Sequence, residues 1–291
     1  MLPLTSLFEQ FLRERRYLKN VTSKTEDWYR SAFGALTRTV LVASPADLNK
    51  AALTSFVVGL RERGLSPVTC NTWAKALNAF FTWLLAEGHI AACLRIQPQR
   101  TEKRILQTLT EEQLRRLVTF KPETTAQWRA YALACTLTDT GIRIEEALRL
   151  RPGDLDFDNL LLKVRGKGRK ERLVPFSSEL RRVLFRWQQR VERERWAGDL
   201  VFATAMGTRL NQRNALRAHY LLLARLDIPK SGFHRLRHTF ATSYLQHGGD
   251  VVRLSRVLGH SQITTTMRYL HLVTEDLQRP HQQLSILNRF R

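Results

Sequence analysis

A polar, basic stretch at residues 94–107 divides this chain into two segments, and that division constrains the fold more than any other feature. The stretch reads LRIQPQRTEKRILQ and contains a proline, so it interrupts the helical pattern before it and is typical of a linker. Each flanking segment is long enough to bury a core of its own. We therefore expect two domains, residues 1–95 and 108–291, joined by a linker at 96–107.

The first segment carries apolar residues at helical spacing in four successive stretches. The first stretch begins at Leu4, and the third follows Asn49. The fourth opens with Ser66 and Pro67, a favourable pair for the cap and first position of a helix, and ends at Gly88. The pattern predicts four short amphipathic helices that pack into a small bundle.

The second segment mixes helical and strand-like patterns. Thr110 and two following glutamates predict a helix start, because a hydroxyl caps the first amides and acids favour the first turn. Residues 160–165 and 169–175 are strand-like around a Gly-Lys-Gly turn, which predicts a hairpin. Helical patterns then dominate from Ser178 onward. The predicted fold class is mostly α (α+β), with a small antiparallel β-sheet in the second domain.

The formal net charge of +21 points to a polyanionic partner, because so much like charge opposes compaction. The excess is spread over the chain, with +6 in residues 1–100 and +15 in the remainder. Arginine outnumbers lysine 37 to 10, and its planar fork binds phosphate in a bidentate manner. Nucleic acid is the first candidate partner and an anionic membrane surface is the second.

The sequence shows neither of the patterns expected for secretion or for a membrane span. No signal peptide precedes the first polar residues, and no apolar run approaches the roughly 18 residues that a membrane span needs. The three cysteines, Cys70, Cys93 and Cys135, form no CxxC pair and are interpreted as small buried side chains in a reducing compartment. We expect a soluble, cytoplasmic protein.

Two local patterns in the second segment carry candidate phosphate-binding cations. In TDTGIRIEEALRL, a glycine turn puts Arg143 at the positive end of a helix, and Glu146 lies one turn on, where it can orient the guanidinium. At the hairpin tip, Lys167 stands between two glycines that let backbone approach a ligand closely. Taken alone, each cation is more often simply solvated.

The pattern HRLRHTFAT places His234, Arg237 and His238 on one face of a helix. A zinc pair of His234 and His238 is an alternative, with His260 or His271 as a third ligand. However, no glutamate follows His234, so the zincin pattern HExxH is not met. The ordinary interpretation is a hydrogen-bonded, half-buried histidine.

Two further signals follow near the end of the chain. LSRVLGH ends at His260, after a glycine that predicts a helix C-cap, and Tyr269 lies nine residues later. Tyr269 alone is one of six tyrosines, and most such residues are core or interface residues. The order of all five signals is what indicates a function, because each one alone is unremarkable.

That order resembles the tyrosine recombinase (phage integrase) family, in particular the two-domain Xer-like and transposon-encoded site-specific recombinases. The flanking segments TGIRIEEALRL, GKGRKERLVPF, HRLRHTFAT and LSRVLGHSQITTTMRY match the family as well. The resemblance implies a catalytic domain at 108–291, and residues 1–95 are more loosely similar to the helical core-binding (SAM-like) domain.

The resemblance also implies a role for each residue. Tyr269 attacks the DNA phosphate and forms a 3′-phosphotyrosine, which is covalent catalysis. Arg143 and Arg237 hold the non-bridging oxygens in the transition state. The other residues assist them: Lys167 protonates the 5′ leaving oxygen, His234 moves the tyrosine proton or positions the phosphate, His260 donates to a non-bridging oxygen, and Glu146 orients an arginine. No metal or other cofactor is implied.

The implied partner is double-stranded DNA, bound by a tetramer on two paired sites. The tetramer consists of identical chains or includes a related recombinase. Leu284, Ile286 and Leu287 near the C-terminus pack on a neighbouring subunit or on their own chain. Two other functions remain open: a catalytically silent DNA-binding relative, and a relaxing topoisomerase that uses the same nucleophile. The expected tasks are integration, excision or resolution of DNA elements such as mobile elements.

Overall fold

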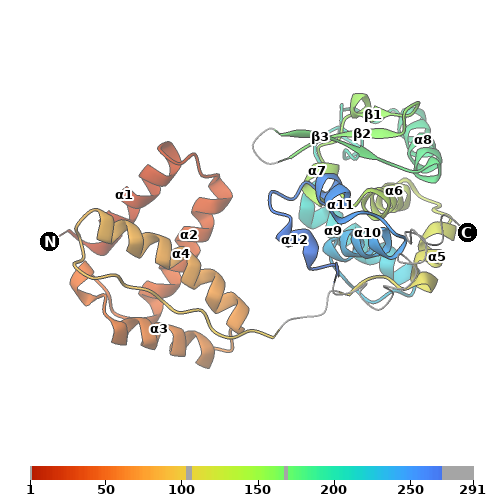
Figure 1. The fold of residues 1–291 in the computed structure, drawn as a ribbon. Helices are drawn as coiled ribbons and strands as arrows, with labels where there is room; N and C mark the ends of the chain where they lie inside the picture. The colour runs from red at the N-terminus through yellow and green to blue at the C-terminus, as the bar shows by residue number, and fades with distance from the viewer. Residues whose placement is uncertain (1, 103–106, 167–169, 271–291) are drawn as a thin grey trace, which may run out of the picture. The chain divides into compact units, whose positions relative to one another are not determined.

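The computed structural model describes residues 2–102, 107–166 and 170–270, and the chain forms two compact units, residues 1–104 and 105–291 (Figure 1). Each unit has a hydrophobic cluster of its own. The predicted fold class is confirmed, because helices dominate and a small antiparallel sheet lies in the second unit.

The first unit is the predicted helical bundle. Its helices are α1 (Leu4–Tyr17), α2 (Ser23–Thr39), α3 (Lys50–Glu62) and α4 (Pro67–Ala86), with a short 3-10 turn η1 (Pro45–Asp47). The Asn49 side chain caps α3, and the Ser66 hydroxyl caps α4 directly before Pro67. Aromatic rings from three helices fill the centre, including Phe8, Phe33 and Phe80.

The segment predicted as a linker begins within the first unit. Asn78 on α4 accepts a hydrogen bond from the Ile96 backbone amide at 2.8 Å and donates to the Ile96 carbonyl at 2.9 Å. Asn71, two turns earlier on α4, binds the backbone of Gln99 in the same way. The two asparagine side chains therefore form the hydrogen bonds with backbone amides and carbonyls that a neighbouring strand or a helical turn would otherwise form.

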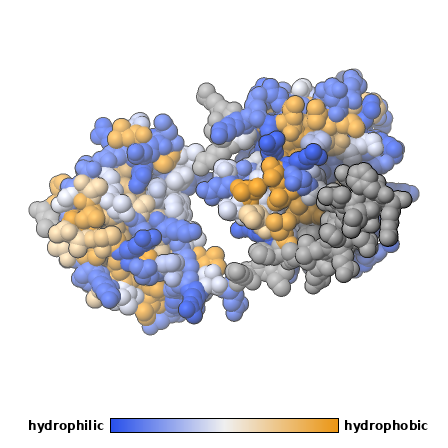
Figure 2. Space-filling view, in the orientation of Figure 1, coloured by the Kyte–Doolittle hydropathy of each residue, from blue (hydrophilic) through white to orange (hydrophobic). Residues whose placement is uncertain are grey.

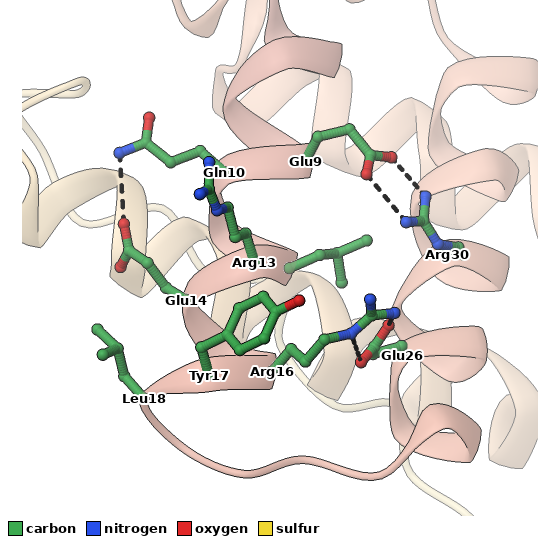
Figure 3. Close-up of a pocket in the computed structure, with 10 residues that line it drawn as sticks. Glu9, Gln10, Arg13, Glu14, Arg16, Tyr17, Leu18, Glu26 and Arg30 are labelled. Carbon is green, nitrogen blue, oxygen red and sulfur yellow. Dashed lines mark hydrogen bonds and ion pairs between the residues drawn. The ribbon is translucent and has the colours of Figure 1, made fainter.

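A groove between α1 and α2 is lined by charged side chains that pair with one another (Figure 3). Arg16 on α1 binds Glu26 on α2, and Glu9 on α1 binds Arg30 on α2. These pairs link the two helices, and their carboxylates neutralise the arginines. Carboxylates therefore hold Arg16 and Arg30, whereas Arg13, which also lines the groove, forms none of the ion pairs found among the described residues.

The second unit is built around helix α6 (Thr125–Thr140), which packs against α8 (Ser178–Arg193), α9 (Gln212–Arg225) and α10 (His234–Gln246). Its buried residues are Ala130, Tyr131, Ala132, Leu133, Ala134, Thr136, Leu137 and Thr140. A helix that is apolar on several faces belongs at the centre of its domain. The remaining elements are α5 (Glu111–Thr119), α7 (Ile144–Ala147), η2 (Pro152–Asp154), α11 (Val251–Leu258) and α12 (Thr264–Met267).

A three-stranded antiparallel sheet in the order β1-β2-β3 lies at one side of the second unit (Figure 1). The strands are β1 (Leu155–Asp156), β2 (Leu161–Arg165) and β3 (Glu171–Pro175), and β2 pairs with β3 as the predicted hairpin. The two-residue strand β1 was not predicted, since so short a segment has no periodicity. The Gly166 amide donates to the Lys170 carbonyl at 2.8 Å at the base of the turn.

Hydrophilic residues are spread over the visible face of both units, with smaller groups of hydrophobic residues between them (Figure 2). Within the described ranges, no helix is long and apolar enough to cross a membrane. Of the three cysteines predicted to be buried, Cys70 is buried and Cys135 is half-buried, and the prediction is wrong for Cys93, which is exposed. Cys93 lies in the irregular segment that leaves α4, where the helical pattern no longer sets which side chains turn inward.

Candidate active site

The turn after α6 positions Arg143. Helix α6 ends at Gly141, whose φ of +64° favours glycine, and a Cβ atom there would lie 2.2 Å from the Phe240 ring. This tight turn makes Arg143 the N-cap of the short helix α7. The Arg143 amide donates to Glu146 Oε2 at 2.8 Å, and its guanidinium donates to Glu146 Oε1 at 3.2 Å.

Arg237 lies in the first turn of α10 and is 5% exposed. Its Nη1 donates to the Gly141 carbonyl at 2.6 Å, and its Nη2 lies 2.8 Å from His260 Nε2. Burial, together with the charge of Arg143, lowers the pKa of Arg237 to about 10. The guanidinium therefore stays charged at neutral pH and is held rigidly.

The carbonyl of Leu258 brings the two arginines together. Arg143 Nη1 donates to it at 3.2 Å and Arg237 Nη2 at 2.9 Å. Helix α11 ends here because Gly259 takes the left-handed conformation, which leaves its last carbonyls available to side chains. Two like charges on one acceptor favour a bound anion, because a phosphate group between them relieves their repulsion.

His260 follows directly and is fixed at both ring nitrogens. Nδ1 lies 2.7 Å from the Thr266 hydroxyl on α12, and Nε2 faces Arg237. Burial first, and then the charges of Arg237 and Arg143, lower the pKa of His260 to about 4. The ring is neutral at neutral pH, with Nε2 accepting from the guanidinium.

Tyr269 is 2% exposed and packs on a small apolar cluster that includes Leu254 and Leu258. Its hydroxyl lies 2.8 Å from His238 Nδ1. Burial raises the pKa of Tyr269, while the nearby charges of Arg237, Arg268 and Arg143 act in the opposite direction. The phenol therefore keeps its proton and lies within the electrostatic field of both arginines.

Glu146 is a buried anchor for this network. Arg172 on β3 donates to both of its oxygens at 2.9 Å, and Arg172 Nε donates to the Val257 carbonyl at 2.8 Å. Burial opposes ionisation of Glu146, but hydrogen bonds from Arg172 and the Arg143 amide outweigh it and lower the pKa of Glu146. The Glu146 carboxylate therefore links α7 to β3, and Arg172 in turn links β3 to the end of α11.

The predicted residues are brought together to different degrees. Arg143, Arg237 and His260 form one hydrogen-bonded network, and Tyr269 lies beside it. His234 is exposed at the start of α10, with its ring centre 6.3 Å from that of His238. Lys167 lies outside the described residues.

The sequence did not predict that three further residues would form hydrogen bonds in this network: Arg172, Thr266 and His238. The sequence indicates only that His238 shares a helix face with His234 and Arg237, with a zinc site as the alternative. Within the part of the chain that the structure describes, no three His, Cys, Asp or Glu side chains form a metal-binding group. His271, a suggested third ligand, lies outside that part.

Comparison with known proteins agrees with this geometry. The phage integrase family profile matches residues 107–276. Tyrosine recombinase XerC of Xanthomonas campestris pv. campestris is 32% identical over 277 residues, which cover 92% of this chain and 84% of the relative. XerC of Oceanobacillus iheyensis is 28% identical over 93% of this chain and 92% of the relative.

Solved structures share the fold. The Tn1549 transposon integrase in complex with transposon right end DNA has a TM-score of 0.79 at 21% identity, covering 97% of this chain and 99% of that one. XerH bound to its difH substrate has a TM-score of 0.71 at 22% identity, covering 96% and 84%.

These matches, with the site described above, show that the chain belongs to the phage integrase family. It is an enzyme of the tyrosine recombinase type, a class that cleaves and rejoins DNA strands.

Proposed function

We propose that this chain recombines duplex DNA at specific sites through a 3′-phosphotyrosine formed by Tyr269. The observation that carries the proposal is the shared Leu258 carbonyl, which brings the guanidinium groups of Arg143 and Arg237 together beside the tyrosine. A scissile phosphate between the two arginines gains charge on its non-bridging oxygens as the tyrosine attacks. Preorganised guanidinium donors stabilise that charge most.

The other predicted residues complete the reaction. His260 donates to a non-bridging oxygen once the phosphate charge favours its protonated form, and Thr266 orients the ring for this. Lys167 protonates the 5′ oxygen as it leaves. His234, exposed at the start of α10, positions the phosphate. Glu146 holds Arg143 in place through its two hydrogen bonds.

The DNA substrate is supported by charge and by the relatives. The net charge of +21 is divided between both halves of the chain, which suits a protein that contacts the phosphate backbone from two domains. The Tn1549 integrase and XerH were each solved with DNA. We infer a core-binding role for residues 1–95 and a catalytic role for residues 108–291.

Assembly and setting are part of the same proposal. We infer a tetramer on two paired sites, built from this chain alone or with a related recombinase, acting in the cytoplasm on mobile or chromosomal DNA. Leu284, Ile286 and Leu287, proposed to pack on a neighbouring subunit, lie outside the described residues.

A selection for covalent DNA capture tests the function and identifies the target sequence in the same experiment. Nicked duplexes with a randomised central segment are incubated with the protein, and protein-linked DNA is recovered and sequenced. We expect wild type to recover one enriched sequence, and Tyr269→Phe to recover none. Two duplexes that carry the enriched sequence should then exchange strands in the presence of the wild-type protein.

The alternatives give different results. A silent DNA-binding relative would retain DNA without any covalent link. A relaxing topoisomerase would form covalent links without an enriched sequence and would relax any supercoiled plasmid. Either result would overturn the proposal of site-specific recombination.

A further inference from the structure

His238 contacts the tyrosine hydroxyl directly, yet the proposed mechanism leaves it unused. Its Nδ1 lies 2.8 Å from the Tyr269 hydroxyl, a normal hydrogen-bond distance. Among the described residues, no other hydrogen-bond partner of this hydroxyl is found. We propose that His238 accepts the phenolic proton when Tyr269 attacks DNA, and returns it when the phosphotyrosine is resolved. The inference rests on the proposed function.

The other two histidines of the site are less suited to this task. His260 already uses both ring nitrogens, one with Thr266 and one with Arg237. His234 is exposed and lies one helical turn before His238, with its ring centre 6.3 Å away. A proton acceptor must reach the proton that it removes, and among the histidines that the structure describes, His238 is the one within that reach.

The hydrogen bond runs from the phenol to the imidazole. Burial raises the pKa of Tyr269, so its hydroxyl carries a proton to donate. Burial and the neighbouring charges of His234, Arg268 and Arg237 lower the pKa of His238 to about 4, so its ring is neutral at neutral pH. Nδ1 therefore presents a lone pair, and Nε2 carries the ring proton.

The charges around His238 show in which direction bound DNA changes its basicity. In the described part of the chain, the charged and titratable groups around His238 are His234 and Arg237 on α10, and Arg268 and Tyr269 after α12. A phosphate bound at the guanidinium groups offsets their positive charge and so raises the pKa of His238, while the larger lowering by burial remains.

The proton balance of the step is complete. The Tyr269 oxygen forms a bond to phosphorus, the bond from phosphorus to the 5′ oxygen breaks, and the phenolic proton moves to His238 Nδ1. Lys167 supplies the proton to the 5′ oxygen. In religation the 5′-hydroxyl gives its proton to Lys167, and the departing tyrosine regains its proton from His238.

The test compares His238→Asn with wild type on a nicked duplex of the selected sequence. Asn Oδ1 occupies a position close to that of His Nδ1, so it keeps the hydrogen bond but cannot take a proton. We expect covalent cleavage to slow about 10²-fold or more, as loss of a general base does. His247→Asn, at the exposed end of the same helix, is the matched control and should cleave at the wild-type rate.

A second readout separates proton transfer from a structural role. Tyr269 is replaced by a fluorinated tyrosine whose phenol ionises more readily, in both the wild-type and His238→Asn proteins. A base defect is corrected by the more acidic phenol, so the His238→Asn protein should recover most of its rate. As the pH falls, the cleavage rate of the wild-type protein should decline between about pH 6.5 and pH 4, because His238 becomes protonated. This decline should be absent from His238→Asn.

The outcomes are distinct from those for the proposed function. If wild type forms no covalent complex, the function itself fails. If wild type cleaves and His238→Asn cleaves equally fast, the base assignment is wrong. A slow His238→Asn protein that the fluorinated tyrosine does not rescue would also overturn it, because His238 would then act only in packing.

Discussion

Replacing Glu146 by glutamine tests the buried carboxylate that holds the site together. Glutamine keeps the shape of the side chain but removes its charge. Glu146 is 6% exposed at its side chain, and Arg172, its bidentate partner, is 16% exposed. The substitution leaves the Arg172 guanidinium without its counter-charge and weakens the hold on Arg143, while the Val257 carbonyl remains as a partner of Arg172.

The expected cost follows from that geometry. Breaking a buried ion pair by removing one partner costs about 3–5 kcal/mol. Arg172 keeps partial access to water, and glutamine still accepts one hydrogen bond, so we expect a cost at the lower end, about 3 kcal/mol. For a domain of this size, the melting temperature of the second unit should fall by about 6–12 °C.

The stability lost in Glu146→Gln should depend on pH, and the pKa of Glu146 sets whether the loss grows or shrinks as the pH falls. The folded-state pKa lies below the ordinary value of 4.5, so the unfolded state takes up the proton first as the pH falls. The stabilisation is present above about pH 4.5 and is lost as the pH falls through the lower folded-state pKa. Glu146→Gln lacks this contribution at every pH, so the two proteins should converge in acid.

Thermal unfolding of wild type and Glu146→Gln across the acid range measures both effects. Glu179→Gln is the control, because Glu179 is 67% exposed and its pair with Arg182 should contribute no more than about 0.5 kcal/mol. The assigned role of Glu146 would be refuted if wild type and Glu146→Gln had equal melting temperatures at neutral pH. It would also be refuted if the difference between their melting temperatures stayed constant in acid.

Three further substitutions test the elements that position the site. Arg237→Lys removes the planar fork that reaches three acceptors, so cleavage should fall about 10²–10³-fold in a single-turnover assay while DNA binding in a mobility-shift assay changes little. Gly141→Ala should lower the melting temperature by several degrees, or about 2 kcal/mol, because φ is +64° and a Cβ atom meets Phe240. Thr266→Val frees the His260 ring and should slow cleavage about 10-fold. A wild-type result from any one of them would remove that residue from the account.

Local signals in the sequence predicted the helix boundaries well. Ser66 and Thr110 cap the helices that they were expected to cap, the third helix begins after Asn49 as expected, and Gly259 ends α11 in the left-handed conformation. These features depend on residues within one turn of each other, so the sequence contains the whole interaction.

Contacts between distant segments could not be predicted in the same way. Glu146 and Arg172 are 26 residues apart, and His238 and Tyr269 are 31 apart, so each contact depends on how β3, α10 and α12 pack. The family motif indicates which residues gather at the site, but not which nitrogen faces which oxygen. Residues 96–99, which fall in the predicted linker, are a related case, since asparagine side chains of α4, rather than local periodicity, hold them.

The most direct test of the central claim is to identify the residue that carries the DNA. The covalent complex is formed on the selected nicked duplex in a chelating buffer, digested, and analysed by peptide mass spectrometry. We predict one modified peptide, with the nucleotide on Tyr269 through a 3′-phosphate, and full yield without divalent metal. A nucleotide on another tyrosine, such as Tyr244 in the same helix as Arg237, or a complex that needs a metal ion, would contradict the account.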